Sequence, residues 1–122
     1  MRIAICTPEF GTLPGQPTGG VAAATEWLIR GLLSLNTPLE IHVLVVPASA
    51  DSFSPTWGHF PVSVHRMKRS RLRNQLGVWG SSDVDTVLTR ISPDVVHVQG
   101  HASSLDGRKH GALLTIHGIP EI

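Results

Sequence analysis

Two glycine-containing segments, far apart in the sequence, carry residue types that could bind an anion and move a proton. Thr18-Gly19-Gly20 directly precedes a helical pattern, so the free N–H groups of a helix N-terminus would face an anionic ligand there. His117-Gly118 follows a short apolar run, where an imidazole could donate or accept a proton and the glycine would let a ligand come close. Ligands of α/β proteins bind at the carboxyl ends of strands, so we expect both segments to lie there.

The glycine pair by itself leaves the ligand open. Gly15 and Gly20 have the spacing of a P-loop, but Val21 occupies the position of the required lysine. The dinucleotide motif Gly-x-Gly-x-x-Gly and the hydrolase motif Gly-x-Ser-x-Gly are both absent from the sequence. A plain loop-to-helix turn explains Gly19-Gly20 as well as an anion site does, because glycine is permissive wherever a turn needs it.

The histidines do not predict a metal site. His97, His101 and His117 have no carboxylate at a useful spacing, so we expect no metal ligation. His42 and His65, like His97, lie within apolar runs typical of strands. We expect these three to be hydrogen-bonded packing residues, because buried polar groups are normally satisfied.

A basic segment, Arg66–Arg73, contains half of the lysine and arginine residues of the chain. It is either a solvated charged face or an anion patch for a phospholipid, a lipid-linked acceptor or a phosphorylated acceptor. We do not expect a nucleic-acid partner, because no aromatic residue alternates with the basic ones as a stacking platform. Trp27, Trp57 and Trp79 are scattered, and we expect them to be packing anchors.

Composition sets the broad class. The chain has 122 residues, 41% of them apolar, which suits a single packed domain, and its net charge of +1 implies no particular partner. Its one cysteine, Cys6, excludes an intrachain disulfide and is expected to be a small core residue. No segment resembles a signal peptide or a membrane span, so we expect a cytoplasmic protein, with Arg66–Arg73 as the segment that could contact the inner face of a membrane.

The hydrophobic pattern predicts alternating strands and helices. The expected strands are Arg2–Cys6, Glu40–Val46, Val62–Met67, Asp94–Val98 and Leu113–Ile116. The expected helices are Gly20–Leu35, Lys68–Trp79, Asp83–Ile91 with Ser81 or Ser82 as its cap, and Ala102–His110; the expected loops include Thr7–Gly19 and Pro47–Trp57. This order predicts an α/β fold: a Rossmann-like parallel sheet with helices on both faces.

Several segments, in chain order, resemble the N-terminal half of a GT-B glycosyltransferase of the family 4 type. They are Arg2–Phe10, Gly19-Gly20-Val21 with Leu28 and Leu32, Pro93–His101, and Leu114–Pro120. The resemblance covers nearly the whole chain. It implies a retaining hexosyltransferase in which two Rossmann-like domains face each other across a cleft, with no metal or other cofactor.

The resemblance also implies roles for individual residues. His117 would be the catalytic residue near the transferred sugar. The donor's diphosphate would lie near Gly19, Gly20 and Gly118, and the acceptor would lie near Glu9, Thr18 and His101. The partners would be a nucleotide-sugar donor and a glycan, lipid or small-molecule acceptor.

On this resemblance, residues 1–122 would be an incomplete acceptor-side domain, and the donor-binding domain of that family would be absent. We therefore expect the chain to be inactive alone and to need a missing or separate donor-binding domain. We also expect the last strand to be an unpaired sheet edge that is prone to association. Two alternatives stay open: a non-catalytic acceptor-binding module, and an α/β module that binds a nucleotide by itself.

Overall fold

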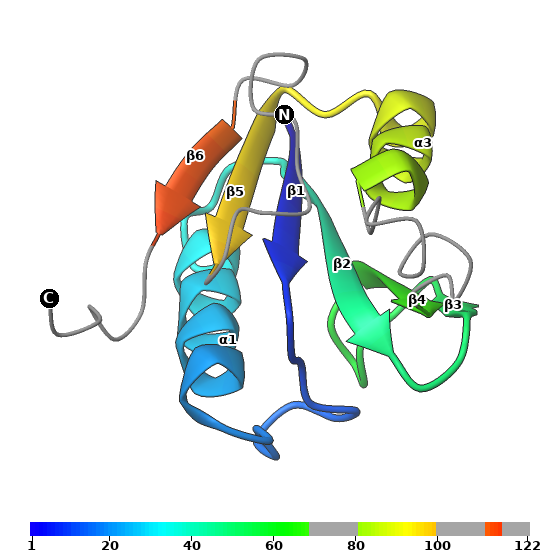
Figure 1. Ribbon diagram of the computed structural model, residues 1–122. Coiled ribbons are helices and arrows are strands. Elements are labelled where there is room, and N and C mark those ends of the chain that lie inside the picture. The colour runs from blue at the N-terminus through cyan, green and yellow to red at the C-terminus, as the bar shows by residue number, and fades with distance from the viewer. Residues whose placement is uncertain (69–80, 100–111, 116–122) are drawn as a thin grey trace, which may run out of the picture.

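The computed structural model describes residues 1–68, 81–99 and 112–115, which form one sheet with a helix on each face (Figure 1). The strands are β1 (Arg2–Thr7), β2 (Glu40–Ala48), β3 (Ser52–Ser54), β4 (Val62–Lys68), β5 (Val95–Gln99) and β6 (Ala112–Thr115). The helices are α1 (Gly20–Leu33) and α3 (Ser81–Ile91).

The sheet has the order β3-β4-β2-β1-β5-β6, with β1 near its centre. All neighbours pair in parallel except β3, which pairs antiparallel with β4. Counted along the chain, the parallel strands lie in the order 3-2-1-4-5, which is the order of doubly wound sheets. The predicted α/β class is therefore confirmed, but the sheet is mixed rather than wholly parallel.

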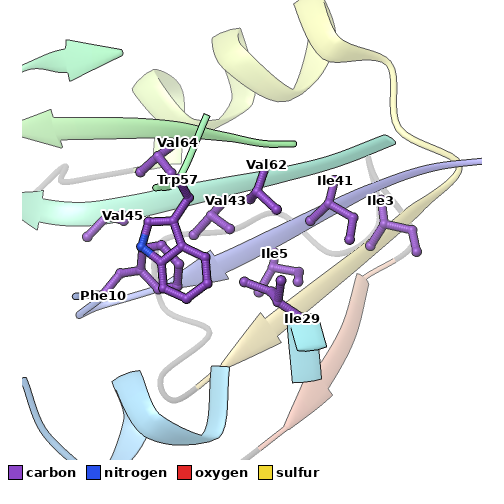
Figure 2. Close-up of a cluster of buried hydrophobic side chains, with 10 residues drawn as sticks. All are labelled: Ile3, Ile5, Phe10, Ile29, Ile41, Val43, Val45, Trp57, Val62 and Val64. Carbon is purple, nitrogen blue, oxygen red and sulfur yellow. The ribbon is translucent and has the colours of Figure 1, made fainter. Parts of the chain in front are cut away.

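Alternating residues of the same strands build two cores, because successive side chains in a strand point to opposite faces. On the α1 face, Ile5, Val43 and Trp57 pack with Ile29 of the helix (Figure 2). On the α3 face, the core residues among those described are Ala4, Cys6, Leu44, Val84, Val87, Leu88, Ile91, Val96 and Val98. Helices on both faces of the sheet, as predicted, are confirmed.

The helix boundaries differ slightly from those predicted. Helix α1 ends at Leu33 rather than Leu35, because the N–H of Leu35 bonds only three residues back, to the carbonyl of Leu32, and the Ser34 hydroxyl donates to the carbonyl of Gly31 at 2.6 Å. Helix α3 begins at Ser81, two residues before the predicted start and within the normal uncertainty of a helix end. Asp94 lies before β5 rather than in it, and its carboxylate accepts a hydrogen bond from the N–H of Arg2.

The predicted loop Pro47–Trp57 is partly wrong. It contains the end of β2 and the whole of β3, whose three residues are exposed and pair with β4. Ser-Phe-Ser is too short and too polar to give an apolar strand pattern, so only pairing with β4 defines it. The predicted helices Lys68–Trp79 (from residue 69 on) and Ala102–His110 lie outside the described residues.

Candidate functional site

The carboxyl ends of the parallel strands form the edge where a ligand of a doubly wound sheet would bind. Helix α1 begins at this edge, below the arrowhead of β1 in Figure 1. The strand order reverses between β1 and β5, and such a reversal is the usual position of the ligand crevice. A small cavity of about 30 Å³ lies here, lined by Cys6, Thr7, Pro8, Leu44, Val46, Val84, Val98 and Gln99.

The first turn of α1 already holds a carboxylate of the protein itself. Oε1 of Glu9 accepts a hydrogen bond from the N–H of Ala22 at 3.3 Å. The helix has no acidic residue in its own first turn, and the extended N-cap residue Gly19 has no side chain to cap it. Glu9 therefore supplies the negative charge that favours a helix N-terminus.

The two glycines of the pair differ in their surroundings. A Cβ on Gly19 would lie 2.7 Å from Oε1 of Glu9, so glycine at this position lets that carboxylate reach the helix. A Cβ on Gly20 would meet no atom within 4 Å. Gly19 thus has a structural explanation in Glu9, whereas the backbone at Gly20 is open to an approaching ligand.

Buried polar contacts hold the loop between β1 and α1 in place. Both carboxylate oxygens of Glu26 accept from the N–H of Gly15 at 3.0 Å, and Arg30 pairs with the same carboxylate at 3.0 Å. Glu26 is 9% exposed, so this acceptor is fixed rather than solvated. The hydroxyl of Thr7 donates to the carbonyl of Glu9 at 2.9 Å and so fixes the start of the loop.

Arg66 also holds the loop between β1 and α1 in place. Its guanidinium donates to the carbonyls of Phe10 and Gly11 at 3.3 and 3.2 Å, and the indole N–H of Trp57 donates to the same Gly11 carbonyl at 3.1 Å. These contacts give Arg66 a structural role that the sequence did not predict, and the anion patch over Arg66–Arg73 stays a prediction. Lys68, at the end of β4, is exposed, and residues 69–73 lie outside the described residues.

The two described tryptophans behave differently. Trp57 is 2% exposed and lies 4.6 Å from the ring of Phe10, as expected of a packing anchor (Figure 2). Trp27 is 74% exposed on α1, so its predicted role as a packing anchor is wrong. The buried side of α1 consists of Ala22, Thr25, Glu26 and Ile29, and at 3.6 residues per turn Trp27 falls on the opposite side. Trp79 lies outside the described residues.

Other candidate residues divide between described and undescribed segments. Thr18 is exposed beside the glycine pair, where an acceptor could reach it. His101, His117 and Gly118, which carry the predicted catalytic and acceptor roles, lie outside the described residues. Strand β6, which leads toward His117, pairs in parallel with β5 at the end of the described sheet. Its outer side is therefore unpaired within the described part of the chain.

Cys6 is a core residue, as predicted. Its side chain is buried at the end of β1, and burial raises the pKa of the thiol to about 12, with a smaller contribution from the negative charge of Asp85. A thiol with so high a pKa stays protonated near neutral pH and is a poor nucleophile.

A second polar cluster lies on the α3 face, away from the carboxyl edge. His42 and His65 are joined between Nδ1 and Nε2 at 3.0 Å, and Nε2 of His42 lies 2.9 Å from Oε2 of Glu40. Arg2 forms an ion pair with the same Glu40 oxygen. The prediction that His42 and His65 are hydrogen-bonded packing residues is confirmed. Their mutual pairing is not visible in the sequence, because it depends on the register of β2 against β4.

Three further findings concern known proteins, membrane spans and metal ligands. Comparison with protein-family models, curated proteins and solved structures gave no match. Neither α1 nor α3 is long and apolar enough to cross a membrane. Within residues 1–68, 81–99 and 112–115, no three histidine, cysteine, aspartate or glutamate side chains converge as metal ligands would.

Proposed function

We propose that the chain forms the acceptor-side, Rossmann-like domain of a retaining, nucleotide-sugar-dependent glycosyltransferase. The observation that carries the proposal is the position of the open Gly20 backbone. It begins α1 at the carboxyl edge of β1, beside the reversal in strand order. A diphosphate group could approach there and accept from helix N–H groups.

The remaining roles follow from the sequence resemblance. His117 would hold a hydroxyl or steady charge at the reacting centre, and Gly118 would allow the donor to come close. Thr18 and His101 would border the acceptor, and no metal is needed. Glu9 has a more specific role than expected: its carboxylate competes with a diphosphate for the first turn of α1.

In this proposal the donor-binding domain is a separate unit, so this chain alone binds nucleotide weakly and transfers no sugar. The alternative of a self-sufficient nucleotide-binding module is favoured by the same open backbone at Gly20. The two differ in affinity, since a complete phosphate cradle within one chain would bind in the micromolar range, whereas half of a shared site would not.

The test is a titration of the folded chain with nucleotide sugars and nucleoside diphosphates. Calorimetry measures the affinity, and backbone amide NMR locates the binding site. We expect millimolar binding that shifts the amides of Gly20, Val21 and Ala22. Micromolar binding would favour the self-sufficient module. Unchanged amide positions at all three residues would contradict both proposals.

Matched variants locate the binding site. Gly20→Val places a side chain over the open backbone and should abolish the amide shifts. Gly31→Val is the control, because Gly31 is also on α1 and also has no atom within 4 Å of a built Cβ. Glu9→Gln removes the competing charge and should strengthen diphosphate binding several-fold. Weaker binding in Glu9→Gln would show that Glu9 assists the ligand.

A further inference from the structure

A second cavity, of about 360 Å³, lies where β3, β4 and α3 meet. Within the described residues its lining consists of Phe53, His65 and Arg90, one from each element. Its volume is within the range of small-molecule pockets. It contains no residue of the carboxyl-edge site, so we consider it as a separate site, named here the His65 cavity.

The hydrogen bonds behind His65 determine which of its ring nitrogens is available to a ligand. The pKa of Glu40 is lowered, first by its hydrogen bond to His42 and then by Arg2, so its carboxylate is ionised and can only accept. Nε2 of His42 must therefore be the donor to Glu40. The other nitrogen of His42, Nδ1, lies 3.0 Å from Nε2 of His65, so Nε2 of His65 is occupied by this hydrogen bond.

This chain of hydrogen bonds uses Nε2 of His65 and leaves its Nδ1 as the ring nitrogen that faces a ligand. Burial, followed by the nearby His42 and Arg90, lowers the pKa of His65 to about 4, so the ring is neutral near pH 7. The residue is only 9% exposed, and within the described part of the chain Nδ1 has no hydrogen-bond partner. A buried ring nitrogen without a partner is unfavourable, and a ligand hydroxyl, which can donate or accept, would satisfy it.

The other two lining residues suggest the rest of such a ligand. Arg90 is an exposed cation in the last turn of α3 and forms no ion pair with any described residue, so its guanidinium can take a carboxylate. Phe53 is 60% exposed, and its ring centroid lies 4.9 Å from that of His65. An exposed ring beside a buried one offers an apolar wall for a flat molecule.

We propose that the His65 cavity binds a small organic acid that has a flat apolar body and a hydroxyl group. The carboxylate pairs with Arg90, the body packs against Phe53, and the hydroxyl forms a hydrogen bond with Nδ1 of His65. This inference does not depend on the proposed glycosyltransferase function, because none of its residues belongs to the α1 site.

The test uses benzoate and its 2-, 3- and 4-hydroxy derivatives as probes, titrated into the full chain at pH 7 and followed by NMR. The isomers sample different distances between carboxylate and hydroxyl. We expect all four acids to bind and at least one hydroxybenzoate to bind about three- to tenfold more tightly than benzoate, as one added hydrogen bond predicts.

Variants assign the two polar contacts. His65→Phe should retain benzoate binding and lose the preference for the hydroxylated acid, whereas His59→Gln, a histidine change on an exposed loop, should preserve both. Arg90→Gln should weaken all four acids by at least about tenfold, and Lys68→Gln, which removes the same charge elsewhere, should not. Circular dichroism establishes that each variant is folded.

Three results would overturn the proposal. The first is the absence of binding of all four acids to the folded chain at millimolar concentration. The second is equal affinity for benzoate and every hydroxybenzoate. The third is a preference for the hydroxylated acid that survives in His65→Phe.

Discussion

The two faces of the sheet use the same strands for different purposes. On the α1 face, isoleucine and valine side chains from β1, β2 and β4 meet Trp57 in a core of buried hydrophobic residues (Figure 2). The α3 face also has a hydrophobic core, but beside it Arg2, Glu40, His42 and His65 take alternate positions of these strands and form a connected polar cluster. The α1 face therefore favours stability that is independent of pH, whereas the α3 face makes stability depend on protonation.

The largest effect is expected on the apolar face. Trp57→Ala should lower the free energy of unfolding by about 3–5 kcal/mol, because it leaves a large cavity and removes the indole hydrogen bond to Gly11. Urea denaturation measures this change. Phe53→Ala, an exposed aromatic beside the α3-face cluster, is the control and should change stability by less than about 1 kcal/mol. Similar losses in both variants would remove the distinction between the faces.

The polar face should lose stability in acid. Unfolded histidine takes up its proton near pH 6.5, but folded His65 does so only near pH 4, so the unfolded state binds more protons between these values. Stability is therefore present above about pH 6.5 and falls as the pH drops toward 4, by at most roughly 3 kcal/mol. His65→Gln, compared with the parent chain by urea denaturation across this range, should flatten the profile. An equally steep profile would assign the proton uptake to another group.

The loop between β1 and α1 is held by polar contacts of Glu26, and a substitution there tests how much these contacts contribute to stability. Glu26→Gln removes the charge that accepts from Gly15 and Arg30, and should cost about 1–2 kcal/mol. Hydrogen exchange at the amide of Gly15 should become faster. Exchange at the amides of β5 should increase only as much as the global loss of stability predicts. Unchanged protection at Gly15 would mean that the loop is held by Trp57 and Arg66 instead.

The smallest effect is a gain. Gly31→Ala on α1 meets no atom within 4 Å of the added Cβ, and its backbone is helical. Alanine should raise stability by about 0.5–1 kcal/mol through helix propensity. Thermal unfolding measures the gain, and a loss would mean that the outer side of α1 is covered.

Much of the fold was predictable because it depends on local patterns. The apolar runs of β1, β2, β4 and β5 and the helical spacing of apolar residues in α1 predict the type of each element. Most of the predicted ends lie within two residues of the observed ones. Strand β3 was missed because its three exposed residues have no apolar pattern. Trp27 was misassigned because the spacing of apolar residues does not show on which side of α1 a tryptophan lies.

The candidate site was predictable only in part. Gly19 and Gly20 were found together at the start of α1, but the carboxylate of Glu9 on that turn comes from ten residues earlier. The predicted roles of His101, His117 and Gly118 stay predictions, since they lie outside the described residues.

The sequence by itself determined the alternation of strands and helices, the division of side chains between two faces, and the helix start at Gly20. These features depend on residues that are close to one another in the sequence. Only the tertiary structure decided the strand order with β1 near the centre, the contacts of Arg66 with the Phe10–Gly11 carbonyls and the pairing of His42 with His65. Each of these joins residues far apart in the sequence, and strand register, which local propensity does not encode, brings them together.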